Sequence, residues 1–207
     1  MDDRKCYKLL YDSQNRISRI DIYRSDTWSS HITFEYSDSH IVMREMDNEY
    51  IENNHTMCIL NAKGFIEKTI TYYNDARSPY TALYFYNEEN QLIRTSDRIE
   101  YFIWENGNIT KEKWIGDETG ADNGYYDEIK YNSTPSSRGF FLFFDDTFFD
   151  IFQNYDLCWL ANFGYFGSVP KNLISEIWED VISYEYYDNG YVSQISGKDF
   201  SWSLVWE

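Results

Sequence analysis

The sequence has few of the residues that rigidify, cross-link or catalyse, with 3 Pro, 3 Cys and 3 His among 207. An odd number of widely spaced cysteines excludes a disulfide framework and a zinc site. We therefore expect buried or partly buried free thiols at Cys6, Cys58 and Cys158. No apolar run approaches the roughly 18 residues of a membrane helix, so no membrane-spanning segment is predicted.

Positive charge is also scarce in this chain. Only 18 Lys and Arg stand against 35 Asp and Glu, which gives a formal net charge of −17. A field of that sign repels phosphate backbones and anionic lipid headgroups. The composition therefore argues against nucleic acid or a charged membrane surface as a partner.

The first residues, MDDRKCYKLLY, contain no hydrophobic core of a secretion signal. Two interpretations stay open at this point. The protein is cytoplasmic, or the sequence is a mature chain whose signal has been replaced by Met1. No apolar run precedes Cys6, so this cysteine does not match a lipid-acceptor position.

Aromatic side chains are abundant, at 20% of the residues, and they favour strands. Six stretches repeat one pattern of a large apolar anchor, a polar turn and an aliphatic residue, which is typical of a β-hairpin. The six anchors are Tyr11, Tyr36, Leu60, Tyr86, Trp104 and Tyr187.

The spacing sorts these hairpins into two classes. A step of five residues from anchor to aliphatic residue fits a two-residue loop, and a step of six fits a type I turn closed by a left-handed residue. The five-step pairs are Tyr36–Ile41, Trp104–Ile109 and Tyr187–Val192, and the six-step pairs are Tyr11–Ile17, Leu60–Ile66 and Tyr86–Leu92. In the second class Asn15, Gly64 and Asn90 hold the left-handed position, which Asn and Gly tolerate.

The repeat predicts a mainly β protein. We expect a large curved antiparallel meander, an open or half-barrel sheet of hairpin repeats, with one helical or loop insertion packed against it. Strands such as ALYFYN are apolar on both faces, so much of the sheet should be covered on both sides. Residues 1–207 are interpreted as one domain, with the meander in 1–137, a Phe-rich insertion in 138–180 and closing strands in 181–207.

The insertion interrupts the hairpin pattern. Asp145 or Asp146 is placed to cap a helix over the apolar residues of 148–155. Trp159 and Leu160 either extend that helix or form a second short one, and 172–180 is expected to be a short helix or an irregular connection. A further strand is predicted at 127–132. The Phe-rich segment is interpreted as core that closes an apolar face of the meander.

No catalytic constellation is recognisable. The sequence lacks a Ser-His-Asp order, a Gly-x-Ser-x-Gly elbow, a His-Glu-x-x-His motif and a phosphate loop, so no catalytic residue, metal site or cofactor is predicted. His40 is expected in an exposed turn. The acidic loop 116–128 lacks calcium-loop spacing and is interpreted as solvated. The best candidates for ligand contact are loop aromatics, namely Trp28, Tyr125 and Tyr126.

The repeated rhythm Y-D/N-x-x-G/N-x-I/L resembles the YD repeats of large bacterial surface and toxin proteins. Across nearly the whole chain, imperfect YD-like hairpins, a Phe-rich insertion and a final YEYYDNGYV hairpin resemble the secreted lipoproteins of Bacteroidetes-type bacteria that have a porin-like β-fold. That resemblance implies a location in the cell envelope, in the periplasm or at the outer-membrane surface. It also implies a lipid anchor in the full-length precursor, and it supplies no catalytic residues.

The leading hypothesis is a non-catalytic binding or scaffold protein of the cell envelope, with a glycan or a protein as its partner. One alternative is a glycan-acting hydrolase, which requires two carboxylates in a cleft, one of them with a raised pKa. The other is a structural component of a larger surface assembly.

Overall fold

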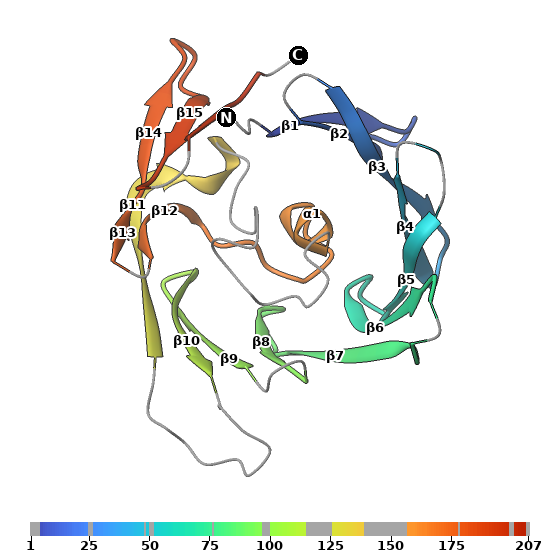
Figure 1. Cartoon of the computed structure of the whole chain (residues 1–207). Helices are drawn as coiled ribbons and strands as arrows, with labels where there is room; N and C mark the ends of the chain where they lie inside the picture. Colours follow the sequence, from blue (N-terminus) through green and yellow to red (C-terminus); the bar gives the residue numbers. More distant parts are fainter. Residues whose placement is uncertain are drawn as a thin grey trace. The chain divides into compact units, whose positions relative to one another are not determined.

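The structure is a computed structural model that describes residues 5–24, 27–47, 49, 52–75, 77–96, 100–114, 126–138, 157–177, 179–198 and 201–205. Thirteen strands, β1 to β13, are antiparallel neighbours in the order of the sequence, and three more strands form a second sheet (Figure 1). The mainly β antiparallel meander predicted from the sequence is confirmed.

The chain divides into two compact units, Met1–Leu83 and Tyr84–Glu207. Unit 1 holds β1 Lys5–Tyr11, β2 Ile17–Arg24, β3 Thr27–Tyr36, β4 His40–Asp47, β5 Glu52–Leu60 and β6 Ile66–Tyr73, and the boundary falls within β7 Tyr80–Tyr86. Unit 2 holds β8 Leu92–Thr95, β9 Glu100–Glu105, β10 Asn108–Trp114, β11 Tyr126–Pro135, the 3-10 turn η1 Ser136–Arg138, α1 Leu157–Asn162, β12 Asn172–Ile177, β13 Asp180–Val181, β14 Ser183–Tyr186, β15 Val192–Ser196 and β16 Ser201–Ser203.

In unit 1 the side chains alternate between an apolar inner face and a polar outer face. Ile32 and Phe34 on β3, and Ile41 and Met43 on β4, point to the inner face and are at most 5% exposed. Residues at every second position share a face, so Thr33 and Glu35 of β3 point to the outer face. The core of unit 1 therefore lies against one face of its sheet.

The predicted turn chemistry is present. Asn15, Gly64 and Asn90 have positive φ, and Asn106 and Gly107 are both positive in the two-residue loop after β9. In the three-residue loops the opening side chain bonds the turn backbone. Asp12, for example, accepts bonds from the Gln14 and Arg16 amides at 2.8 and 2.9 Å. Loop length and local residues therefore specify these hairpins together.

The last hairpin differs from the prediction. Tyr186, and not Tyr187, faces Val192, and the Gly190 amide donates to the Tyr187 carbonyl at 2.8 Å across a three-residue loop. The bulge that follows this loop turns Val192 to the same face as Ile195, where both are at most 2% exposed. Burial of these two side chains on one face explains the longer loop.

In unit 2 the segment after α1 packs against two hairpin tips. Phe166 makes an edge contact with Tyr84 at 4.8 Å, and the Ser168 amide donates to the Asn90 carbonyl at 2.8 Å. The Lys171 amide donates to the Gly107 carbonyl at the same distance. These contacts hold the described part of the insertion against the meander strands of its own unit.

The rest of the insertion corrects one expectation and leaves another untested. Residues 172–177 form strand β12, paired with β11, and not a helix or an irregular connection. Ile174 and Ile177 are buried there, and the strand continues the sheet. Trp159 and Leu160 lie on the short helix α1. The helix predicted over 148–155 and its caps lie outside the described residues.

Cys58 and Cys158 are free, buried thiols, as predicted, and burial raises the pKa of Cys58. Cys6 lies on β1, and its side chain is outside the described part. Among the described residues there is no helix of the length and apolarity that crossing a membrane requires.

Candidate functional site

The structure places the three predicted ligand contacts differently. Trp28 lies within strand β3 and not in a loop, and its ring stacks on His31 at 5.5 Å and 24°. His31 is 4% exposed, and burial, together with the charge of Arg19, lowers its pKa. Tyr126 begins β11 opposite Lys113. The side chain of Tyr126 and the whole of Tyr125 lie outside the described residues.

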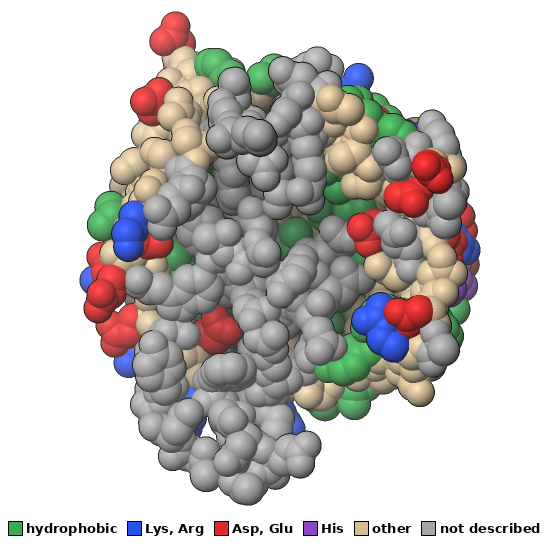
Figure 2. All heavy atoms as spheres, viewed as in Figure 1, with side chains coloured by type: hydrophobic (Ala, Val, Ile, Leu, Met, Phe, Trp, Pro, Cys, Tyr) green, Lys and Arg blue, Asp and Glu red, His purple; other side chains and the backbone are tan. Residues whose placement is uncertain are grey.

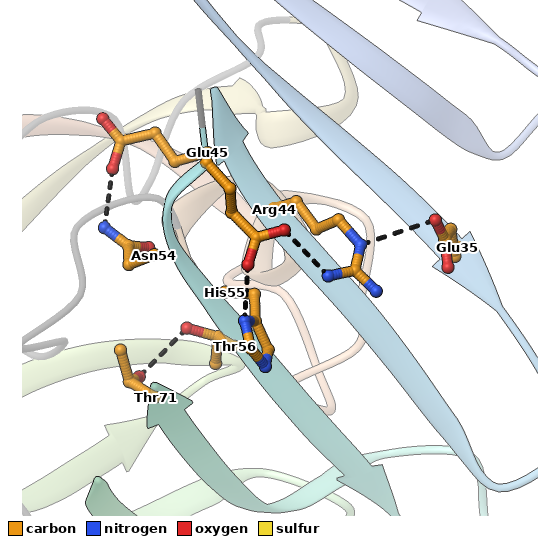
Figure 3. Close-up of polar contacts among 8 residues, drawn as sticks. Glu35, Arg44, Glu45, Asn54, His55, Thr56 and Thr71 are labelled. Carbon is orange, nitrogen blue, oxygen red and sulfur yellow. Dashed lines mark hydrogen bonds and ion pairs between the residues drawn. The ribbon is translucent and has the colours of Figure 1, made fainter. Parts of the chain in front are cut away.

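The outer face of unit 1 carries a polar network formed by Glu35, Arg44, Glu52 and His55 (Figure 3). Arg44 Nη1 lies 3.0 Å from Glu52 Oε2, and Arg44 Nε lies 3.5 Å from Glu35 Oε1. His55 Nδ1 donates to the other Glu52 oxygen at 2.7 Å, and its ring stacks on Tyr72 at 4.8 Å. Strands β3, β4 and β5 therefore supply the network, and β6 supplies the Tyr72 ring beside it.

The electrostatics of this network oppose acid catalysis. Burial by itself disfavours the charged form of Glu52, but hydrogen bonds from His55 and Arg44 outweigh it and lower the pKa of Glu52. A glycosidase acid needs the opposite shift, because it must hold a proton at neutral pH. The network therefore suits cross-strand stabilisation of the sheet.

The inner face of the same strands holds a second polar group. Asn54 Nδ2 donates to Glu45 Oε2 at 2.7 Å, and the hydroxyls of Thr56 and Thr71 lie 3.0 Å apart in the core (Figure 3). Asn54 Oδ1 is buried without a hydrogen-bond partner among the described residues. These side chains pair across β4, β5 and β6 and carry no reactive arrangement.

Carboxylates neutralise the arginines of unit 1. Arg16 Nη2 lies 2.7 Å from Asp12, Arg19 Nε lies 2.6 Å from Asp21, and Arg77 Nε lies 2.8 Å from Asp75. With Arg44, these are all the arginines of unit 1 whose side chains the structure describes. On the face drawn in Figure 2, several basic side chains likewise lie beside acidic ones.

Unit 2 presents a different arrangement on the outer face of β7, β8 and β9. Arg94 pairs with Phe85 on one side and with Tyr101 on the other. Its guanidinium carbon lies 5.3 Å from the Phe85 ring centroid and 5.4 Å from that of Tyr101. Phe85, Tyr101 and Ile103 are 40%, 37% and 36% exposed. We call Phe85, Arg94, Tyr101 and Ile103 the Arg94 surface.

No carboxylate among the described residues pairs with Arg94, and its Nε is buried without a hydrogen-bond partner. On the next strand Lys113 faces Tyr101 and Lys111 faces Ile103, and Lys111 Nζ lies 3.6 Å from a Glu128 carboxylate oxygen. The Arg94 surface therefore combines exposed rings with an uncompensated guanidinium, beside two further cations.

The alternation within ALYFYN was a sequence signal for this surface. The prediction that the sheet is covered on both sides obscured it. Alternation within ALYFYN separates Phe85 from the buried Tyr84, and the hairpin registers then place Arg94 and Tyr101 beside Phe85. At Phe85 and Tyr101 that prediction is wrong, since both rings are exposed. Exposed apolar rings on a regular strand therefore make this surface a candidate site.

Within the described part of the chain, no group of three or more His, Cys, Asp or Glu residues could hold a metal ion. His40 is the first residue of β4, where its Nδ1 is 2.8 Å from Ser37 Oγ. Contrary to the prediction, it directly follows the turn of Asp38 and Ser39 and does not lie in it. The acidic loop stays a prediction, because residues 115–125 lie outside the described ranges.

Among solved structures, the chain is similar to a porin-like protein from Bacteroides uniformis, with a TM-score of 0.60 and 16% sequence identity. The match covers 94% of this chain and 86% of that one. At this identity the likeness shows the fold alone, and it bears out the porin-like β-fold that the resemblance implied. No family model and no curated protein matches the chain.

Proposed function

We propose that the chain is a non-catalytic binding protein of the cell envelope that holds its partner, a glycan or a protein, on the Arg94 surface. The observation that carries this proposal is the guanidinium of Arg94, which lies between two exposed rings and pairs with no carboxylate among the described residues. Contiguous exposed apolar side chains mark interaction sites in proteins, and Arg and Tyr are frequent anchors of binding energy.

The Arg94 surface is also preorganised. Phe85, Arg94 and Tyr101 lie on three hydrogen-bonded strands, so their relative positions are fixed before a partner arrives. A rigid set of contacts reduces the entropy lost on binding. This rigidity supports a binding site built on the sheet, in place of the loop site expected from the sequence.

The envelope location rests on two supports. The fold is similar to that of a porin-like protein from a Bacteroides species, and the hairpin pattern resembles secreted lipoproteins. We propose that the full-length precursor is exported and lipid-anchored. Fractionation of cells that express the native gene tests this, and recovery of the protein only in the cytoplasm would contradict it.

The non-catalytic part of the proposal rests on the carboxylates. The pKa values of Asp12, Glu52 and Asp75 are all lowered, because hydrogen bonds from Arg or His partners favour the ionised form. None of these three groups supplies a proton donor of the kind that glycoside hydrolysis requires.

A glycan and peptide array tests the binding function. The unmodified protein should bind a subset of ligands, and Phe85→Ser with Tyr101→Ser should weaken that binding at least about tenfold, as loss of aromatic anchors does. Tyr187→Ser is the matched control, because Tyr187 is 43% exposed at the tip of another hairpin. No binding, or equal binding by both variants, would refute the proposal. Co-purification of a partner that is unaffected by the Phe85 and Tyr101 substitutions would favour the structural-assembly alternative.

A further inference from the structure

We infer that the Arg94 surface recognises a carboxylate-bearing oligosaccharide, whose acid group pairs with Arg94 while neighbouring sugar rings stack on Phe85 and Tyr101. This inference rests on the proposed function and names the class of ligand. It follows from how the chain uses its other arginines.

Two arginines of unit 1 show a recurrent three-part arrangement of ring, guanidinium and carboxylate. Arg16 lies 4.3 Å from the centroid of the Tyr36 ring and bonds Asp12. Arg77 lies 4.0 Å from that of Tyr73 and bonds Asp75. In both cases the guanidinium carbon lies over the ring while a guanidinium nitrogen bonds the carboxylate.

At Arg94 the rings are present, and the described residues supply no carboxylate. Phe85 and Tyr101 occupy the two neighbouring strands, yet no acidic group of the described residues reaches the guanidinium. A guanidinium presents a planar fork of donors that matches a carboxylate in two parallel bonds. A ligand carboxylate therefore completes at Arg94 the arrangement that Asp12 and Asp75 complete elsewhere.

The two rings favour a glycan over other anions. Phe85 and Tyr101 lie on strands separated by a third, which places their backbones about 10 Å apart. That separation spans more than one sugar, so an oligomer can stack on both rings with its acid group at Arg94 between them. The apolar faces of sugar rings suit such exposed aromatic platforms, and the exposed Ile103 extends the platform.

The charge of the chain limits the length of this ligand. The net charge of −17 repels a long polyanion, whereas the guanidinium of Arg94 attracts an acid group at contact distance. Long-range repulsion is screened beyond about 8 Å at physiological salt. A short oligomer at moderate salt is therefore the favoured ligand.

Calorimetry with the unmodified protein tests the inference without any variant. Short oligogalacturonates should bind at least about tenfold more tightly than the same oligomers after methyl esterification, because the ester keeps the rings and removes the charge. Equal binding of acid and ester would overturn the inference that a carboxylate is recognised, and it would leave the proposed binding function standing. Absence of binding to both would also overturn it, and the array then decides the proposed function separately.

Variants test whether Arg94 is the residue that binds the ligand carboxylate. Arg94→Gln should remove the preference for the acid over the ester, and Arg94→Lys should retain part of it, since lysine keeps the charge and loses the fork. Arg77→Gln is the control, because Asp75 already occupies that guanidinium. Circular dichroism and thermal unfolding check that each variant folds. An unchanged preference in Arg94→Gln, or tighter binding of an oligoglutamate peptide of equal charge, would overturn the inference.

Discussion

The two units of this protein surround the arginine side chain differently. In unit 1 the four described arginines each pair with a carboxylate of the same unit, and Arg44 pairs with two. In unit 2 Arg94 lies between two rings and has no such partner among the described residues. An ion pair made within the chain adds modestly to stability, whereas an unpaired guanidinium keeps its donors for a ligand.

The two units also differ in the space around their turn glycines. Gly64 closes a hairpin of unit 1 at φ 83° with no atom within 4 Å of the position of a Cβ. Gly167 in unit 2, at φ 84°, lies against the Asn90 carbonyl and the Tyr86 ring. Unit 1 needs its glycine for backbone conformation alone, while unit 2 needs it also to pack the segment after α1.

The glycine pair gives the largest expected effect. Gly167→Ala should lower the free energy of unfolding by about 2–4 kcal/mol, since a Cβ would add a backbone clash to the strain of positive φ. Gly64→Ala should lower it by about 1 kcal/mol, from strain alone. Urea denaturation measures both, and equal losses would show that the packing of Gly167 contributes nothing.

The arginine comparison predicts a smaller difference in stability. Arg44→Gln should lower the free energy of unfolding by about 1 kcal/mol, because Glu52 and the more exposed Glu35 lose their shared cation. Arg94→Gln should change it by no more than about 0.5 kcal/mol, from its ring contacts. A larger loss for Arg94 than for Arg44, again by urea denaturation, would contradict the assignment of Arg94 to binding.

The comparison can also be broken by design. Ser96→Asp places a carboxylate two residues after Arg94, which is the spacing of Arg19 and Asp21. The new acid should occupy the guanidinium and weaken binding of the acidic oligomer about tenfold, with the free energy of unfolding nearly unchanged. Ser96→Asn is the control of equal size, and calorimetry should show wild-type affinity for it. Equal loss in both variants would point to a steric effect.

The smallest effect is a pH dependence of unit 1. The pKa of Glu52 is lowered in the folded protein from its ordinary value of 4.5. Its contribution to stability is therefore complete above pH 4.5 and is lost as the pH falls through the lowered pKa. Glu52→Gln should flatten the decline of the free energy of unfolding in this acid range. Denaturant titrations at a series of pH values measure this decline. An identical decline in both proteins would show that Glu52 does not contribute.

The hairpins show how much of the turn structure local sequence determines. The positive φ of Asn15, Gly64 and Asn90, and of the pair Asn106-Gly107, follows from loop length and residue type alone. The last hairpin shows the limit, because Asn189-Gly190 fits two loops equally well. A usable signal lay further along, where Val192 and Ile195 stand three residues apart, as do Ile17 and Ile20 after another three-residue loop.

Other features depended on contacts between distant residues. Strand β12 was missed because its residues pair with β11, more than 35 residues earlier in the sequence. The Arg94 surface required the register of three strands and the exposure of both rings.

The sequence by itself determined the repeated hairpin, its turn residues and the excess of negative charge, because each depends on residues close together or on composition. Only the tertiary structure decided which arginines find a carboxylate. The partners of a guanidinium are set by which strands lie beside it, so Arg44 forms ion pairs with acids of β3 and β5. By the same register Arg94 meets two rings, and this difference separates a stabilising contact from a candidate binding site.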